Sequence, residues 1–293
     1  MKDLKDRIKQ DIAHQYYERY LHTTQRNGPM VSVQSVDETI SMLQNTNKSL
    51  VRFGDGEMAM IRGRDLKLQK SDPELRRRLV NLLGNPYVDL AVSVQDIFRG
   101  LEMYRPASQL FWEDHFLFYH GYYREYCRKD QEYATTLFSR CYITLMNTSH
   151  CQEWFDRIRA IWSDKDVVIV EGVRTHNGVG NDLMSRCKSV ERILIPPTDA
   201  FASYDKILKA CKECRSDKIF LLSAGACAKP LAEDLFRSGY RVIDIGNLDM
   251  EYEWFHMKAR DKCPISKHAV VGRTENMRAG YCQYLDEVRE EIE

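Results

Sequence analysis

The run Val167-Val168-Ile169-Val170, followed at once by Glu171-Gly172, decides the fold predicted for this chain. Four apolar residues in succession, three of them valine, are typical of a strand buried on both faces of a sheet. The same unit recurs further along. Short apolar strands are expected at 193–195, 219–222 and 241–245, with helices at 152–162, 203–214 and 231–238. This alternation predicts an α/β fold with a parallel sheet covered by helices on both faces.

The carboxyl ends of the expected strands carry the polar and glycine-rich segments of the chain. In parallel sheets, ligands bind beyond these ends, so the segments are expected to meet at one edge of the sheet. There are four of them, at residues 52–57, 171–182, 223–226 and 244–254. Each is a candidate contributor to one binding site.

The first segment, Arg52-Phe53-Gly54-Asp55-Gly56-Glu57, follows the apolar pair Leu50-Val51 and precedes a helix expected near Met58. Asp55 and Glu57 offer hard oxygen ligands, which suit Mg²⁺ or Mn²⁺ carrying a substrate phosphate. Arg52 can bind a phosphate with its guanidinium fork, and Gly54 allows a ligand to approach the backbone closely. A second interpretation is a solvated turn in which Asp55 caps the helix.

The second segment carries Arg174, His176, Gly178 and Gly180 before a short helix expected near 181–187. A Cβ-free loop that opens a helix can receive a diphosphate on the first free N–H groups, and Arg174 and His176 would add positive charge. The spacing is not that of a dinucleotide fingerprint. In the alternative interpretation, Asn181 and Asp182 simply cap the helix.

The last two segments offer small residues and carboxylates. Ser223-Ala224-Gly225-Ala226 is a small-residue turn before a helix, although Lys229 does not have the spacing of a P-loop. In 244–254, a helix starting near Asp249 places Asp249 and Glu253 on one face and Glu251 elsewhere. A carboxylate here can act as general base toward an acceptor hydroxyl, with Glu253 the first choice. Alternatively, Asp249 and Glu251 only stabilise the N-terminus of the helix through its dipole.

Composition narrows the class of protein. The 293 residues contain 43 Lys and Arg against 43 Asp and Glu, so nothing favours a nucleic-acid partner. No signal-peptide core and no membrane span are expected, and nine scattered cysteines fit free thiols in the cytoplasm. Residues 4–21 predict an amphipathic helix that packs on the body of the protein or on a second subunit, which allows a homo-oligomer.

Together the four segments resemble one family, the bacterial glycosyltransferases of the GT-D type. The resemblance rests on 52–57, on Glu171-Gly172 with 178–183, on 192–196, and on 239–246 with Asp249 and Tyr252-Glu253-Trp254. It spans roughly residues 45–270. It implies three parts: an N-terminal helical extension (1–45), a GT-D type domain (46–272) and a C-terminal helical tail (273–293).

The resemblance implies a Rossmann-like sheet and a metal-dependent site for a nucleotide sugar, commonly UDP-glucose. Asp55 and Glu57 match the motif that holds the metal, Mn²⁺ or Mg²⁺. A hexose, with glucose the first choice, would pass to a hydroxyl of a glycan or glycoprotein acceptor. The implied donor site involves these residues: Arg52, Gly54, Arg174, His176, Gly178, Gly180, Asn181, Asp182, Gly225 and Asn247. The acceptor would be handled by Asp249, Glu251 or Glu253.

The chain departs from the family pattern at three points. His176 stands where the pattern has Arg, Asn247 where it usually has His, and the turn 223–226 lacks Gly-Pro. Exchanging Arg for His removes a permanent charge and a bidentate fork. Two alternatives therefore stay open: a nucleotide-sugar-binding protein that has lost transfer, and another Rossmann-like nucleotide-dependent enzyme.

Overall fold

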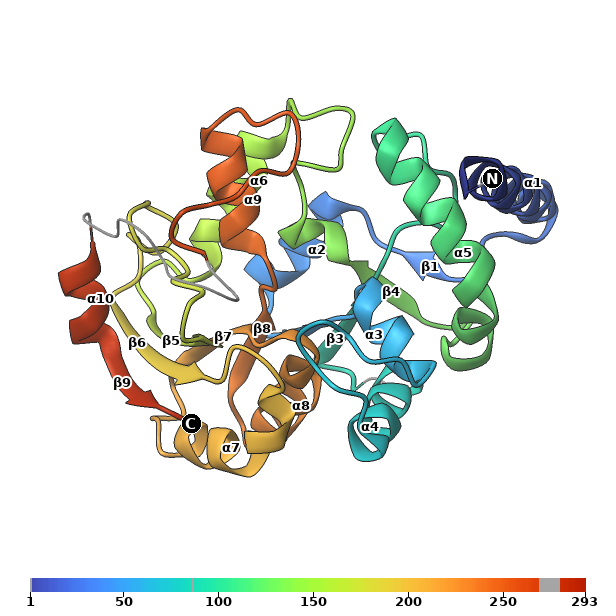
Figure 1. Cartoon of the computed structure of the whole chain (residues 1–293). Helices are drawn as coiled ribbons and strands as arrows, with labels where there is room; N and C mark the ends of the chain where they lie inside the picture. Colours follow the sequence, from blue (N-terminus) through green and yellow to red (C-terminus); the bar gives the residue numbers. More distant parts are fainter. Residues whose placement is uncertain (1, 86, 269–279) are drawn as a thin grey trace.

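The computed structural model describes residues 2–85, 87–268 and 280–293, and the strands of this part form one nine-stranded parallel sheet (Figure 1). The strand order is β1-β4-β3-β2-β8-β7-β5-β6-β9. The strands are β1 (Ser32–Val33), β2 (Ser49–Arg52), β3 (Leu90–Val94), β4 (Glu132–Thr135), β5 (Asp166–Gly172), β6 (Ser189–Ile195), β7 (Ile219–Ser223), β8 (Arg241–Asp244) and β9 (Val288–Glu291). The predicted α/β fold, a Rossmann-like parallel sheet with helices, is confirmed.

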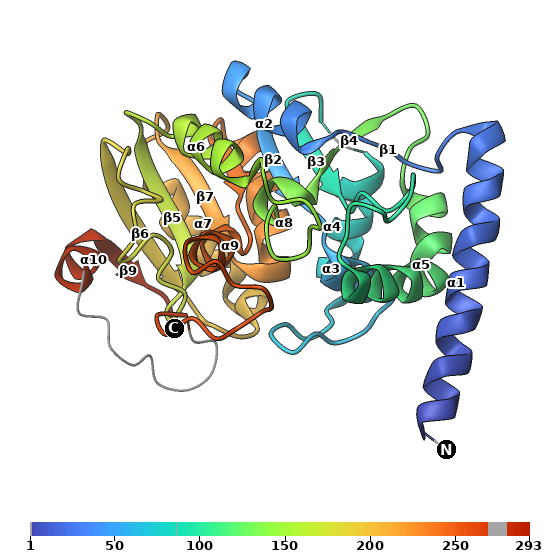
Figure 2. The ribbon, with the colours of Figure 1, turned by 90° about the horizontal axis from the view of Figure 1, so that it is seen from above.

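Helices cover both faces of the sheet and one end of the molecule. α2 packs with α6 on one face, and α8 packs with α4 and α7 on the other (Figure 1). α1 lies against α5 at the end of the molecule beyond β1 (Figure 2). The helices are α1 (Lys2–Asn27), α2 (Val36–Asn45), α3 (Asp55–Ile61), α4 (Pro73–Gly84), α5 (Pro106–Tyr126), α6 (Cys151–Ile161), α7 (Tyr204–Lys212), α8 (Ala228–Arg237), α9 (Leu248–His256) and α10 (Tyr281–Glu287).

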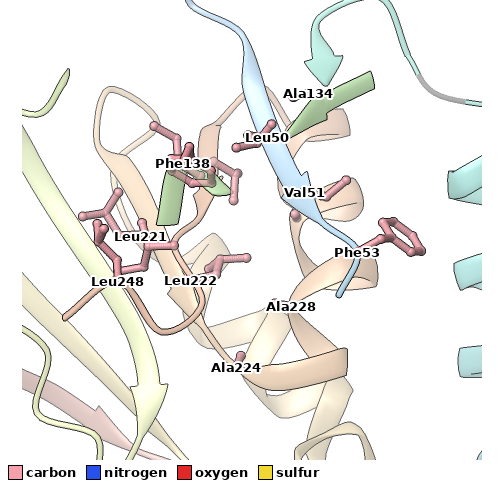
Figure 3. Packing of buried hydrophobic residues seen from close by; sticks show 14 of the residues in the cluster. Leu50, Val51, Phe53, Ala134, Phe138, Leu221, Leu222, Ala224, Ala228 and Leu248 are labelled. Carbon is pink, nitrogen blue, oxygen red and sulfur yellow. The ribbon is translucent and has the colours of Figure 1, made fainter. Parts of the chain in front are cut away.

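The central strands are buried because helices cover both sides of them. Val167 to Val170 of β5 have no exposed surface, as the continuous apolar run predicts. Leu50 and Val51 of β2 lie in the same core as Leu221 and Leu222 of β7 (Figure 3). Burying a side chain of this size contributes about 1.5–3 kcal/mol. This core fixes the relative positions of the strand ends that carry the candidate site.

The pairing of β2 with β8 joins distant parts of the chain. Leu50 is in register with Ile243, and β2 pairs with β3 on its other side. The chain therefore builds outward from β2 through β3 and β4 before it crosses to the other half of the sheet. Where the strand order reverses in this way, between β2 and β8, the loops after the two neighbouring strands diverge and leave room for a ligand.

Two predicted elements differ from the structure. The helix expected at 181–187 is absent, and this stretch forms turns instead. Gly178 and Gly180 adopt positive φ angles of 77° and 75°, which lead the chain away from a helical path. The predicted helical tail ends in a strand, β9, which pairs with β6, while residues 273–279 of that tail lie outside the described part.

The N-terminal segment also joins the sheet. Ser32–Val33, within the stretch expected to be a helical extension, pairs with β4 as β1. α1 itself is longer than the expected helix over residues 4–21. Among the described helices, α1 included, we find none whose length and apolar character would suffice to cross a bilayer.

Candidate functional site

A cavity of about 380 Å³ opens at the carboxyl ends of β2, β5, β7 and β8. All four segments predicted to carry ligand-binding residues line it, as expected from their places at strand ends. The lining residues from these segments are Arg52, Gly54, Asp55, Gly56, Glu57, Gly172, Arg174, Thr175, Ser223, Ala224, Gly225, Ala226, Asp244, Gly246, Asn247 and Met250. The volume is in the range of small-molecule sites.

The turn from β2 into α3 separates the two carboxylates of the Asp-x-Glu motif. Asp55 is the first residue of α3, and its side chain is exposed at the cavity. Glu57 is buried, and its Oε2 accepts a hydrogen bond of 2.6 Å from the N–H of Gly54. Any Cβ at position 54 would lie 3.1 Å from that oxygen, so glycine keeps this turn tight. Glu57 thus caps α3, while Asp55 remains available to a ligand.

Lys229 of α8 occupies the space between two buried carboxylates. Its Nζ lies 2.8 Å from Oε1 of Glu57 and 3.1 Å from Oδ2 of Asp244. It also donates to the carbonyl of Gly225 at 3.0 Å. Burial raises the pKa of Glu57, but Lys229 and Arg52 outweigh it, so the net pKa lies below its usual value. For Asp244, burial prevails and raises the pKa.

Arg52 lies at the cavity wall beside two glycines. A Cβ at Gly246 would lie 3.2 Å from Nη1 of Arg52, and Gly246 has a φ of 50°. The Nε of Arg52 is buried and has no hydrogen-bond partner within the described chain. The guanidinium fork can still bind an anionic oxygen from the cavity, because Arg52 is one of the residues that line it. The position of Arg52 in the cavity lining is compatible with the predicted phosphate-binding role.

The loop after β5 divides into a part at the cavity and a part behind it. Arg174 and Thr175 line the cavity. His176 is buried, and its Nδ1 hydrogen-bonds the carbonyl of Lys267 at 2.8 Å. Burial lowers the pKa of His176. The predicted donor-site residues that follow it lie outside the cavity lining: Gly178, Gly180, Asn181 and Asp182.

Asp249 is fully buried in a set of donors behind the cavity. It accepts hydrogen bonds of 2.8 Å from the N–H of Gly178 and from Nδ2 of Asn181. Lys267 and His268 also contact its carboxylate. Burial opposes ionisation, but His268 and Lys267 lower the pKa of Asp249 to about 2. Asn181 therefore binds Asp249 rather than capping a helix.

The three candidate catalytic carboxylates of α9 have different surroundings. As predicted, Asp249 and Glu253 share one face, since Asn181 Nδ2 contacts both. Glu251 points elsewhere and is fully buried. Its Oε2 accepts from the N–H groups of Tyr142 and Ile143 at 3.0 and 2.9 Å. None of the three carboxylates lines the cavity as the structure describes it.

Two residues at the cavity carried no usable signal in the sequence. Lys229 does not have the spacing of a P-loop lysine, and its partners Glu57 and Asp244 are distant in the chain. His268 lines the cavity in a stretch with no recognisable motif. Both positions follow from tertiary packing, which short-range patterns do not encode.

The model of one protein family, described as glycosyltransferase GT-D fold, matches residues 50–272. The chain belongs to the GT-D fold glycosyltransferase family. Two solved structures resemble this GT-D chain with a TM-score of 0.86 over the full length of each. One is a glycosyltransferase (DUF1792) from Streptococcus sanguinis, 35% identical over 90% of this chain. The other, 29% identical over 96%, is the domain of unknown function 1792 described as having a distinct glycosyltransferase fold.

Two curated relatives are longer proteins. The probable glycosyl transferase Gly of Streptococcus gordonii is 39% identical over 240 residues, which are 81% of this GT-D chain and 35% of that protein. The glycosyltransferase GlyD of Streptococcus pneumoniae serotype 4 (strain ATCC BAA-334 / TIGR4) is 35% identical over 82% of this chain and 30% of its own length. The chain thus spans about a third of the length of these relatives.

Proposed function

We propose that this chain transfers a hexose, with glucose the first choice, from a UDP-sugar to a hydroxyl of a glycan or glycoprotein acceptor. Membership of the GT-D family supports a glycosyl transfer. The observation that carries the proposal is the cavity at the four strand ends, where Arg52 and Asp55 face the same space. A guanidinium and an exposed carboxylate at one cavity suit a diphosphate and its counter-ion.

Mn²⁺ or Mg²⁺ is the proposed cofactor. Mg²⁺ is commonly held by one or two carboxylates together with substrate phosphates, so a large protein ligand set is not required. Within the described residues no group of three acidic, His or Cys side chains forms a metal cage. Asp55 would be the first ligand, and Glu57 would join it by exchanging Lys229 for the metal at Oε1. A bound divalent ion neutralises charge on the leaving diphosphate.

The protein residues have distinct proposed roles toward the donor. Arg52 would bind a diphosphate oxygen through its guanidinium, and Arg174 would add a second cation, since both residues line the cavity. Gly225 and Asn247 would border the donor, since both line the cavity. His176 would support the site from behind by holding Lys267, and Gly178 and Asn181 by holding Asp249. Asp182 contacts Tyr252 and Arg159 instead. UDP-glucose is the first-choice donor for these residues.

Thermal unfolding with nucleotides and nucleotide sugars tests the proposal. UDP-glucose with Mn²⁺ should stabilise the chain by RT ln(1 + [L]/Kd), about 2.7 kcal/mol at 100 times Kd. Release of UDP from UDP-glucose should accompany binding. Binding without any release would instead support a nucleotide-sugar-binding protein, in line with His176 and Asn247. Stabilisation by S-adenosylmethionine but not by UDP-glucose would support a different Rossmann-like enzyme.

A cytoplasmic location and a homo-oligomer are further parts of the proposal. All nine cysteines are free thiols, which is typical of a reducing compartment. Leu4, Ile8 and Ile12 of α1 are 62%, 50% and 53% exposed, which favours a covered α1 in an assembly. Light scattering of the purified chain will give its mass in solution, and a monomer at all concentrations would contradict the oligomer.

A further inference from the structure

We propose that His268 is the base that takes the proton from the acceptor hydroxyl and that Asp249 positions it; this inference rests on the proposed glycosyl transfer. His268 lines the cavity shared by Arg52 and Asp55. Its Nε2 contacts Oδ2 of Asp249, which lies behind the cavity wall. The pair therefore connects a buried carboxylate to an imidazole at the surface of the candidate site.

The surroundings of Asp249 determine which ring nitrogen of His268 carries the hydrogen that lies between the two residues. The carboxylate is fully buried and is contacted by the N–H of Gly178, Nδ2 of Asn181 and Nζ of Lys267, the last at 2.9 Å. Such donors keep the carboxylate ionised, so it only accepts hydrogen bonds. The hydrogen between the two residues therefore lies on Nε2 of His268. The neutral ring then carries its lone pair on Nδ1, which has no hydrogen-bond partner among residues 2–85, 87–268 and 280–293.

The other candidate bases are engaged elsewhere. Oε1 of Glu253 contacts Nδ2 of Asn181 at 2.6 Å and Nζ of Lys267 at 2.7 Å. Glu251 binds the backbone of residues 142–143. The imidazole of His176 is directed to the carbonyl of Lys267. Among these four groups, only His268 lines the cavity and also has a ring nitrogen without a hydrogen-bond partner in the described part of the chain.

The proposed transfer is a single displacement at the anomeric carbon of the donor sugar. The acceptor oxygen forms a bond to the anomeric carbon of the donor sugar, and the bond from that carbon to the diphosphate oxygen breaks. The nucleoside diphosphate leaves with the electron pair of that bond. The acceptor proton moves to Nδ1 of His268, and the ionised Asp249 stabilises the imidazolium that forms. This is the arrangement of a carboxylate and an imidazole in general-base catalysis.

UDP release from UDP-glucose, with water as the acceptor, provides the assay. His268→Ala in the full chain should lower kcat by about 10²–10⁴ and change the Kd of UDP-glucose by less than about twofold. Added imidazole should restore part of the lost rate in a saturable manner, because it can enter the vacated space and accept the proton. His22→Ala, an exposed histidine of α1, is the matched control and should keep the wild-type rate.

Asp249→Asn separates the positioning role from the catalytic one. Its amide can donate to Nε2 of His268, which moves the ring hydrogen to Nδ1 and removes the base. The rate should fall, and imidazole should not restore it, because the His268 ring still fills the site. Circular dichroism and the melting temperature report whether either variant is folded.

Three results would overturn the inference. His268→Ala could keep kcat within about threefold of wild type. The variant could instead lose only its affinity for UDP-glucose, which would make His268 a donor-binding residue. A folded His268→Ala with a low kcat could also fail to respond to imidazole. If the wild-type chain neither binds nor hydrolyses UDP-glucose, the proposed function itself fails, and this outcome is distinct from the other three.

Discussion

Lys229 lies 2.8 Å from Oε1 of Glu57, the same carboxylate whose other oxygen caps α3 through the N–H of Gly54. The second residue of the Asp-x-Glu motif therefore already has a cation in the described structure. The neighbouring carboxylate, Asp55, is exposed at the cavity. This asymmetry makes the two motif residues distinguishable by experiment.

Asp55→Ala should abolish UDP release while leaving the melting temperature of the chain unchanged, because the side chain is exposed. Glu57→Ala should abolish the release and also lower the free energy of unfolding by about 3–5 kcal/mol, since it leaves Lys229 buried beside Asp244 alone. UDP release and thermal unfolding measure the two effects. Turnover retained by both variants would exclude the proposed metal site.

Lys229→Met should increase the affinity of the chain for Mn²⁺ by about tenfold or more. It frees Oε1 of Glu57, so that both carboxylates of the Asp-x-Glu motif are available to a divalent cation. Electron paramagnetic resonance of free Mn²⁺ measures this affinity without any turnover. Lys209→Met, an exposed lysine of α7, is the control. An unchanged Mn²⁺ affinity in folded Lys229→Met would show that Lys229 does not compete with the metal.

Glu251→Gln should reduce stability rather than catalysis. Glu251 is fully buried, and its Oε2 binds the N–H groups of Tyr142 and Ile143, with Arg140 at 3.2 Å from Oε1. Replacing the carboxylate weakens these bonds and leaves Arg140 uncompensated, which should cost about 1–3 kcal/mol of unfolding free energy. Urea unfolding measures this. A collapse of kcat at full stability would instead restore Glu251 as a catalytic residue.

Asp96 makes the stability of the chain depend on pH. The residue is 7% exposed, and burial raises the pKa of its carboxyl from 3.8 to about 6, although Arg99 opposes the shift. The folded state therefore favours the neutral acid. This contribution is fully present below the unfolded pKa near 4 and is lost as pH rises through about 6.

Asp96→Asn removes the ionisable group and should stabilise the chain at pH 8 by about 3 kcal/mol. The advantage should shrink to less than about 1 kcal/mol at pH 4, where Asp96 is protonated in the folded state and about half protonated in the unfolded state. Urea unfolding at the two pH values checks this. An equal effect of the substitution at both pH values would show that Asp96 does not titrate with a raised pKa.

Local patterns were sufficient to predict the sheet and the places of the four segments. The apolar run 167–170 and its repeats indicate parallel strands, and parallel strands bring their carboxyl ends to one edge. The same patterns failed at 181–187, where Asn181 binds Asp249 from a turn instead of starting a helix. This contact, with a side chain 68 residues away, is one that local patterns cannot predict.

The positions of the candidate catalytic carboxylates relative to the cavity depend on contacts between residues far apart in the chain. The sequence placed Asp249 and Glu253 on one face of α9 correctly, because helical periodicity fixes this relation. It could not show that both carboxylates lie behind the cavity wall. Their burial depends on Lys267 and on the loop after β5, which meet only in the folded chain.

The order of strands in the sheet has a consequence for the synthesis of the protein. β2 emerges from the ribosome long before β8, and the backbone of Arg52 contacts Asp244, 192 residues later in the chain. Until β8 is made, the apolar edge of β2 at Leu50 and Val51 has no partner on that side. Nascent chains stopped before residue 241 should therefore be prone to aggregation and to chaperone binding. The binding cavity is completed only when the last third of the chain has been translated.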